Sequence, residues 1–289
     1  MNNTPKKNLI NGIASDFLSI DDRAIHYGDG LFETILCKGD KLYYWSQHFL
    51  RLQTSAERLK ISCPPEPLLL DDIARLCEEN SMQAGQACVI KIILSRGVGK
   101  RGYKFPDNAT PNRLLMLSGV AAKHSSLLSE ELLSGKLFLC EQQVSINKNL
   151  AGIKHLNRLE NVLARNEWHG DYIDGLMLNA NGYAIEGSMS NLFAIKDKQL
   201  FTPDLVLSGV NGIVREVIMQ IAREQGIDVI VEDLDVEALL AMDALFISNS
   251  LIGMKAVTVF SDVTYNNSLV SHNIFDELLN SMDDHAQVI

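Results

Sequence analysis

The feature of this sequence that most restricts its fold is the presence of two hydrophobic periods within the first 120 residues. Short apolar runs flank the pairs Asn11-Gly12 and Gly39-Asp40, which predict tight turns between antiparallel strands. Two stretches between residues 46 and 82 carry apolar residues at helical spacing. The apolar runs "ACVIKIILSRG" and "NRLLMLSGV" then return to strand character. Antiparallel hairpins beside amphipathic helices predict an α+β (mixed α/β) fold.

The chain of 289 residues is long enough for two hydrophobic cores, and its pattern predicts two domains. The stretch "AAKHSSLLSEELLSGK" is polar and shows no clear strand, so we expect an interdomain linker at residues 121–127. An N-terminal α/β domain would then occupy residues 1–120. A C-terminal α/β domain would occupy residues 128–289 and carry the lysine discussed below. Its strands would form a meander followed by the helix "NGIVREVIMQIAREQG".

Composition excludes several classes of protein. A formal net charge of -10 argues against a general nucleic-acid binder, which normally has an excess of Lys and Arg. No apolar run approaches the roughly 20 residues of a membrane helix. Five cysteines without CxxC pairs, and no signal peptide, predict free thiols in a reducing cytoplasm. The seven histidines show no metal-ligand spacing, so we expect no metal site.

Lys154 lies in the run "GIKHLN", just ahead of a predicted helix. Asn157 and Glu160 have the spacing of a capping box, which would start the helix there. A lysine at a helix N-terminus opposes the macrodipole. The same field, together with desolvation, would lower the pKa of its amine and make it a nucleophile suited to a Schiff base. An ordinary solvated lysine is the alternative.

Three further features could bind a charged cofactor. Glu186 ends an apolar run in "YAIEGSMSNLF"; if buried, it would need a cationic partner such as a protonated pyridine nitrogen, whereas a water-facing acid would need none. The helix start in "NGIVRE" offers backbone N–H groups to an anion, although most helix starts bind only water or a cap. Arg51 could turn towards a phosphate or extend its stem over the surface.

Taken together, these segments resemble the fold-type IV pyridoxal-phosphate enzymes, the group of the branched-chain and D-amino-acid aminotransferases. The segments "HYGDGLFET", "HFLRL", "GIKHLN", "EGSMSNLF", "NGIVRE" and "ISNSLIG" match that family's motifs in its order along nearly the whole chain. The resemblance implies the two-domain architecture of that family, with pyridoxal 5'-phosphate as the cofactor. The implied catalytic residues are Lys154 and Glu186, and the implied cofactor-binding residues are Lys154, Arg51, Glu186, Ile213, Val214, Ser250 and Asn157.

The family resemblance assigns these cofactor residues separate roles. Lys154 would form the Schiff base, and Glu186 would bind the pyridine nitrogen. Arg51, the backbone at Ile213 and Val214, and Ser250 would contact the phosphate. Asn157 would lie near the phenolic oxygen.

The loop "SRGVGKRGYKF" concentrates positive charge between two apolar strands. A solvated basic loop is one interpretation, and an anion-binding loop is the other, with Arg101 the better fork for a carboxylate. In the related D-amino-acid aminotransferases, the residues matching Arg101 and Tyr103 reach the substrate from the neighbouring subunit. The resemblance therefore implies a homodimer with shared sites. Phe32, in the N-terminal signature, is the third expected substrate-binding residue.

The segments "LAGIKHLNRLENVL" and "SRGVGKRGY" are most similar to the aminodeoxychorismate lyase subgroup. Gly253 and Ala256 stand where the aminotransferases usually carry an acid and a proline. This resemblance implies conversion of 4-amino-4-deoxychorismate to 4-aminobenzoate and pyruvate in folate biosynthesis, with aminodeoxychorismate synthase as a functional partner. One alternative is a branched-chain or D-amino-acid aminotransferase on the same scaffold. The other is a non-catalytic binding module that has kept the fold.

Overall fold

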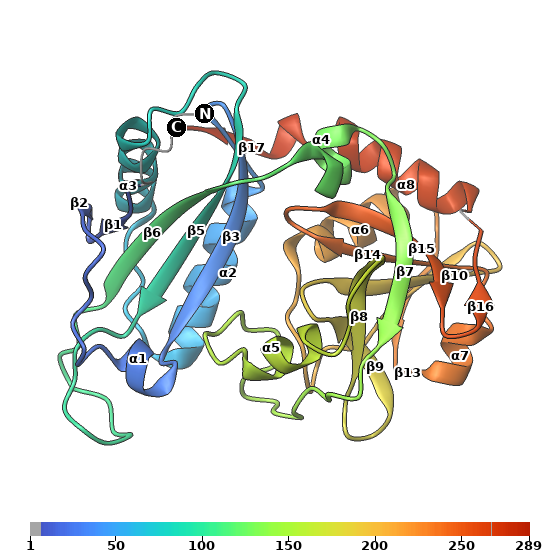
Figure 1. Ribbon diagram of the computed structural model, residues 1–289, viewed down its shortest axis with the longest axis horizontal. Helices are drawn as coiled ribbons and strands as arrows, with labels where there is room; N and C mark the ends of the chain where they lie inside the picture. Colours follow the sequence, from blue (N-terminus) through green and yellow to red (C-terminus); the bar gives the residue numbers. More distant parts are fainter. Residues whose placement is uncertain (1–6, 267) are drawn as a thin grey trace. The chain divides into compact units, whose positions relative to one another are not determined.

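The protein divides into two compact units, each built around its own sheet (Figure 1). The computed structural model describes residues 7–266 and 268–289. Unit 1 comprises Met1–Val120, Lys154–Asn157 and Asp283–Ile289. Unit 2 comprises Ala121–Ile153 and Arg158–Met282. Sheets and helices in both units confirm the predicted α+β fold class.

Unit 1 is built on a seven-stranded sheet in which all neighbouring strands are antiparallel. The strand order is β17-β4-β3-β5-β6-β1-β2. Its strands are β1 (Leu9–Ile10), β2 (Ile13–Ala14), β3 (Gly30–Lys38), β4 (Lys41–Tyr43), β5 (Ala87–Ser95), β6 (Asn112–Gly119) and β17 (Ala286–Val288). The long pair β3–β5 forms the centre of this sheet.

Both hairpins predicted in unit 1 are present. Ile10 pairs with Ile13 across Asn11 and Gly12, whose φ angles are 52° and 78°. Two consecutive left-handed residues match the right-handed twist of paired strands, which explains the Asn-Gly sequence. Strands β3 and β4 are likewise joined by only Gly39-Asp40.

The helices of unit 1 are α1 (Arg23–Tyr27), α2 (Trp45–Leu59) and α3 (Glu66–Glu79). Helix α2 packs along β3 and α3 along β6 (Figure 1). Trp45, His48, Leu52 and Ala56 are buried on α2 at intervals of three or four residues, so one face of the helix meets the sheet. This packing places the polar residues of α2 close to the start of β3.

Unit 2 contains a ten-stranded sheet in the order β12-β11-β10-β14-β15-β7-β8-β9-β13, with β16 paired to β15. Strand β9 also pairs with β10, which closes the path from β10 through β14, β15, β7 and β8. Its strands are β7 (Ser134–Leu139), β8 (Tyr172–Leu178), β9 (Tyr183–Gly187), β10 (Asn191–Lys196), β11 (Gln199–Pro203), β12 (Val229–Glu232), β13 (Leu234–Asp235), β14 (Ala244–Asn249), β15 (Gly253–Phe260) and β16 (Val263–Thr264).

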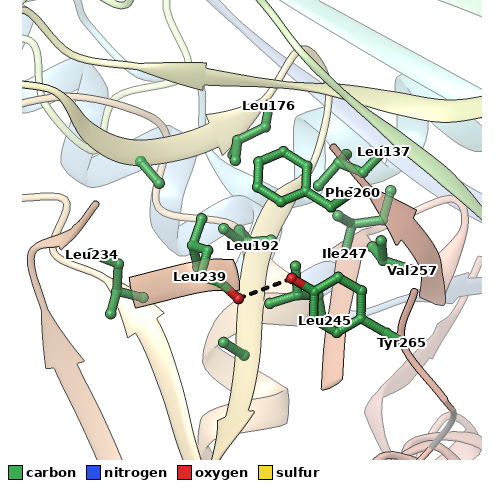
Figure 2. Close-up of a cluster of buried hydrophobic side chains, with 12 residues drawn as sticks. Leu137, Leu176, Leu192, Leu234, Leu239, Leu245, Ile247, Val257, Phe260 and Tyr265 are labelled. Carbon is green, nitrogen blue, oxygen red and sulfur yellow. Dashed lines mark hydrogen bonds between the residues drawn. The ribbon is translucent and has the colours of Figure 1, made fainter. Parts of the chain in front are cut away.

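Leucine, isoleucine, valine and phenylalanine side chains from these strands meet in one hydrophobic cluster (Figure 2). Tyr265 reaches into the same cluster and donates its hydroxyl to the carbonyl of Leu239 at 3.0 Å. Burying each such aliphatic side chain contributes roughly 1.5–3 kcal/mol. The helices of unit 2 are α4 (Ser126–Ser129), α5 (Leu159–Arg165), α6 (Ile213–Glu224), α7 (Val236–Leu240) and α8 (Leu269–Asn280). Helix α6 packs on both α8 and β14.

The units differ from the expected domains in three places. Residues 121–127 are not a linker but part of unit 2, because the backbone of Ser126 donates to Ile252 and the Ser125 hydroxyl donates to Leu251. The segment Lys154–Asn157 belongs to unit 1, so the lysine predicted for the second domain lies in the first unit. Residues Asp283–Ile289 also return to unit 1, where β17 pairs with β4.

Candidate active site

The segment that carries Lys154 lies beside the beginning of β3. The backbone N–H of Phe32 donates to the Lys154 carbonyl, and the N–H of Leu156 donates to the Gly30 carbonyl, both at 3.0 Å. His155 and Leu31 form an antiparallel bridge between these bonds. The Lys154 Nζ atom lies 4.4 Å from the centroid of the Phe32 ring. The structure thus brings together Lys154 and Phe32, two of the predicted site residues.

Arg51 belongs to a buried ion cluster with two residues that the sequence analysis missed. Its Nε and Nη2 atoms donate to the Glu33 carboxylate at 2.9 and 2.6 Å. His48 Nδ1 lies 2.6 Å from the same carboxylate, and His48 and Glu33 are 1% and 2% exposed. Glu33 therefore fixes the orientation of the Arg51 guanidinium. The available signal was the spacing of His48 and Arg51, which places both side chains on one face of α2.

Burial of the Glu33 carboxyl opposes its ionisation, but Arg51 and His48 outweigh this effect and lower its pKa to about 2. An ionised carboxylate can only accept hydrogen bonds, so Nδ1 of His48 must carry the proton. Burial lowers the pKa of His48; Glu33 opposes this, whereas the positive charges of Arg51 and Lys154 add to it. Among the described residues, the buried Nε2 of His48 has no hydrogen-bond partner.

The predicted capping box at Asn157 and Glu160 is wrong. Helix α5 begins at Leu159, and its N-cap is Arg158, which makes no side-chain capping bond. Asn157 instead donates its Nδ2 to the Gly28 carbonyl at 3.1 Å, and Glu160 accepts from the backbone of Ser145. The N-cap of α5 therefore lies one residue later in the chain than predicted.

Glu186 lies at the end of β9 and is only 4% exposed, so the water-facing alternative is wrong. Its Oε2 atom accepts from the backbone N–H of Val210 at 2.7 Å, and its Oε1 atom lies 4.0 Å from Nη1 of Arg158. Arg158, which the sequence analysis left without a role, is thus a cationic neighbour of the buried carboxylate.

The turn after Val210 leads into α6 and requires glycine. Asn191 donates its Nδ2 to the Val210 carbonyl at 2.9 Å. A Cβ atom on Gly212 would lie 2.0 Å from Asn191 Oδ1, so no larger residue fits without displacing that side chain. Gly212 is the N-cap of α6, and it supplies no side-chain bond. The N-cap therefore offers no side chain to the first N–H groups of this 12-residue helix, which include those of Ile213 and Val214.

Asp174 is a second residue that the sequence analysis missed. This fully buried carboxylate accepts from the hydroxyls of Ser188 and Ser190 at 2.5 and 2.6 Å. Burial raises its pKa despite these hydrogen bonds. Because Ser188 and Ser190 follow Glu186 closely in the chain, Asp174 fixes the turn beyond it. A Cβ atom on Gly187 would lie 2.4 Å from Asp174, which explains the glycine between them.

Ser250 lies half-buried in the turn after β14. Asn249 fixes this turn, because its Oδ1 accepts from the N–H groups of Leu251 and Ile252 at 2.8 Å. The preceding Ser248 is fully buried, and within the described residues its hydroxyl has no hydrogen-bond partner.

Arg101 and Tyr103 lie on the loop between β5 and β6, where both are exposed, Tyr103 by 86%. Unit 1 thus holds Lys154, Phe32, Arg51, Asn157, Arg101 and Tyr103, and unit 2 holds Glu186, Ile213, Val214 and Ser250.

Within residues 7–266 and 268–289, no helix has the length and apolar character needed to cross a bilayer. The same residues contain no group of three or more histidine, cysteine or acidic side chains arranged to hold a metal ion.

A family model described as amino-transferase class IV matches residues 30–260. The chain belongs to this amino-transferase class IV family, which confirms the resemblance seen in the motifs.

Both aminodeoxychorismate lyases and aminotransferases are among the similar proteins. Aminodeoxychorismate lyase of Vibrio harveyi is 34% identical over 253 residues, covering 87% of this chain and 90% of that protein. D-alanine aminotransferase of Listeria monocytogenes is 28% identical over 243 residues, covering 83% and 81%. The crystal structure of 4-amino-4-deoxychorismate lyase from Pseudomonas aeruginosa has a TM-score of 0.85 and 31% identity, covering 96% of this chain and 99% of that one.

Proposed function

We propose that the protein is an aminodeoxychorismate lyase that converts 4-amino-4-deoxychorismate to 4-aminobenzoate and pyruvate, a reaction of folate biosynthesis. The observation that carries this proposal is the likeness to two lyases, at 34% and 31% identity over most of the chain. The D-alanine aminotransferase is less similar, at 28%. Gly253 and Ala256 support the same choice, since the aminotransferases usually have an acid and a proline there.

The residues described above fit pyridoxal 5'-phosphate. Lys154 would hold the cofactor covalently, and the buried carboxylate of Glu186 suits a protonated pyridine nitrogen. The phosphate would be bound by Arg51, by the N–H groups of Ile213 and Val214, and by Ser250. The N-terminus of α6, whose N-cap offers no side chain, is suited to an anion. Asn157 would contribute near the phenolic oxygen. When bound, this cofactor supplies an electron sink next to the substrate's amino group.

Lys154 is the residue we expect to move protons. Its amine would take the proton from C4 of the substrate ring and then return a proton to the departing enolpyruvate. The C3–O bond breaks, the ring becomes aromatic, and pyruvate leaves, so no keto-acid acceptor is consumed. Phe32 lies against the lysine amine and limits its access to water. Arg158 lies beside Glu186, where its positive charge balances part of the buried negative charge.

Incubation of the cofactor-loaded protein with aminodeoxychorismate tests the proposal. We expect 4-aminobenzoate and pyruvate in equal amounts, and neither product from Lys154→Ala. A D-amino-acid aminotransferase is the second candidate, because the Listeria relative has that activity in its name. In that case D-alanine alone, without an acceptor, would convert the bound cofactor to its amine form. Loaded protein that yields no 4-aminobenzoate would rule out the lyase.

We also propose a homodimer in which Arg101 and Tyr103 of each subunit bind substrate at the other subunit's Lys154. Both residues are exposed on the loop after β5, which leaves them accessible to a second copy. Aminodeoxychorismate synthase would be the functional partner that supplies the substrate.

A further inference from the structure

The loop that carries Arg101 is attached to α1 by a buried arginine. Arg23 is only 3% exposed, although the loop that it contacts is open to solvent. Its Nη1 atom donates to the Gly102 carbonyl at 3.0 Å, and its Nη2 atom donates to the Tyr103 carbonyl at 3.1 Å. A charged fork buried to bind two consecutive carbonyls holds that part of the backbone in one conformation.

Asp29 fixes Arg23 from the other side. Its Oδ2 atom accepts from Nε of Arg23 and from Nε of Arg96, both at 2.8 Å. Burial of the Asp29 carboxyl would raise its pKa, but the two guanidinium groups together lower it. Arg96 also donates to the carbonyls of Leu59 and Lys60 at the end of α2. The orientation of Arg23 is therefore set by the rigid part of unit 1.

Tyr27 provides a second attachment. Its hydroxyl accepts from the backbone N–H of Gly102 at 2.9 Å, and its ring lies under the Arg23 guanidinium at 4.7 Å. The N–H of Gly102 belongs to the peptide plane shared with Arg101, and its carbonyl belongs to the plane shared with Tyr103. Both planes are therefore held. Gly102 has a φ of 115°, which only glycine adopts readily, so the chain turns sharply between the two side chains.

We propose that Arg23 and Tyr27 are positioning residues that aim Arg101, and through it determine the affinity for the substrate's carboxylate. This inference rests on the proposed function, in which Arg101 binds that carboxylate. A guanidinium fork gains from a carboxylate only when both are correctly oriented. Without these bonds, an exposed loop with few buried apolar contacts would sample many conformations. Each productive encounter would then require the loop to be ordered first.

Tyr27→Phe is the sharpest test, because it removes one hydroxyl and keeps the ring. We expect KM for aminodeoxychorismate to rise about five-fold, as for the loss of one neutral hydrogen bond. Arg23→Lys keeps the charge but loses the fork, and KM should rise about ten- to hundred-fold. In both variants kcat and the absorption spectrum of the bound cofactor should stay the same. Arg75→Lys, an exposed site on α3 in the same unit, is the matched control.

The decisive measurement combines Tyr27→Phe with Arg101→Ala. If Tyr27 acts through Arg101, the effect of Tyr27→Phe on KM should disappear in the Arg101→Ala background. An undiminished effect there would overturn the inference. So would unchanged KM in Tyr27→Phe while Arg101→Ala alone raises it strongly. Unchanged KM in Arg101→Ala alone would instead overturn the substrate role of Arg101 on which the inference depends.

Limited proteolysis tests the same attachment without any activity. Lys100, Arg101 and Lys104 are exposed in the single subunit, so trypsin can cleave the loop whenever the loop moves away from the partner subunit. Because one hydrogen bond fewer opposes local opening, we expect cleavage there to be about five-fold faster in Tyr27→Phe than in the parent protein, and unchanged in Arg75→Lys. If Arg23→Lys fails to fold, as judged by circular dichroism, Tyr27→Phe still decides the matter. Equal cleavage rates in Tyr27→Phe and the parent protein would show that the hydroxyl does not hold the loop.

Discussion

Glu33→Gln should lower the free energy of unfolding, and the decrease should be larger at neutral pH than at acidic pH. The pKa of Glu33 falls from 4.5 in an unfolded chain to about 2 in the structure. At 1.36 kcal/mol per pH unit, this difference corresponds to about 3 kcal/mol of unfolding free energy at neutral pH. A neutral amide cannot replace the charge, and it leaves the Arg51 guanidinium without its anion. Breaking a buried pair in this way typically costs about 3–5 kcal/mol.

The sign follows from the lowered pKa. The contribution of Glu33 to the free energy of unfolding is fully present above pH 4.5, the ordinary pKa of the group, and is lost as the pH falls towards its pKa of about 2 in the folded protein. Urea unfolding of the cofactor-free protein, followed by circular dichroism between pH 7 and pH 3, measures it. The difference in the free energy of unfolding between the parent protein and Glu33→Gln should be largest at pH 7 and should decrease below pH 4.5. Glu57→Gln removes an exposed carboxylate of α2 and serves as the control. The same difference in the free energy of unfolding at every pH would show that ionised Glu33 does not stabilise the fold in this way.

Four other changes test the proposed site. Lys154→Ala should abolish turnover and the long-wavelength absorption of bound cofactor; borohydride reduction followed by mass spectrometry that placed the cofactor on Lys148 would contradict the assignment. Glu186→Gln should keep cofactor but lose most activity, since an amide cannot hold the pyridine proton; near-normal turnover would count against it. Arg51→Ala should weaken cofactor binding about ten- to hundred-fold in a titration, and unchanged affinity would mean that Arg51 does not bind the phosphate. Lys154→Ala and Arg101→Ala proteins, refolded together, should regain some activity if sites are shared, and verified heterodimers without activity would mean that they are not.

Local sequence patterns were sufficient for the features that depend on neighbours in the chain. The turn at Asn11-Gly12 needs only two residues that tolerate positive φ, so it could be predicted from those two letters. The position of Glu186 at the end of an apolar strand run left burial and a water-facing position both open, and only the structure shows that the carboxylate is buried.

Features that depend on residues far apart in the sequence were missed, because the sequence around a residue does not show which distant residue it will contact. Asn157 has a capping sequence, but the carbonyl of Gly28 binds its side chain instead. Nothing near Asp174 in the sequence indicates that two serines beyond Glu186 will satisfy it. Motifs in family order located the candidate residues of both units. They could not show that Glu33 and His48 hold Arg51, because that cluster joins a strand and a helix.

The return of residues 283–289 to unit 1 affects how the chain can fold during synthesis. Strand β4 at residues 41–43 pairs on one side with β3 at once, but its other edge waits for β17. At about 5–20 residues per second, that edge stays open for roughly 10–30 s after β6 has been made. An open strand edge is a template for pairing with other chains. A deletion that removes Ala286–Val288 would make this exposure permanent, and aggregation through β4 is the expected result.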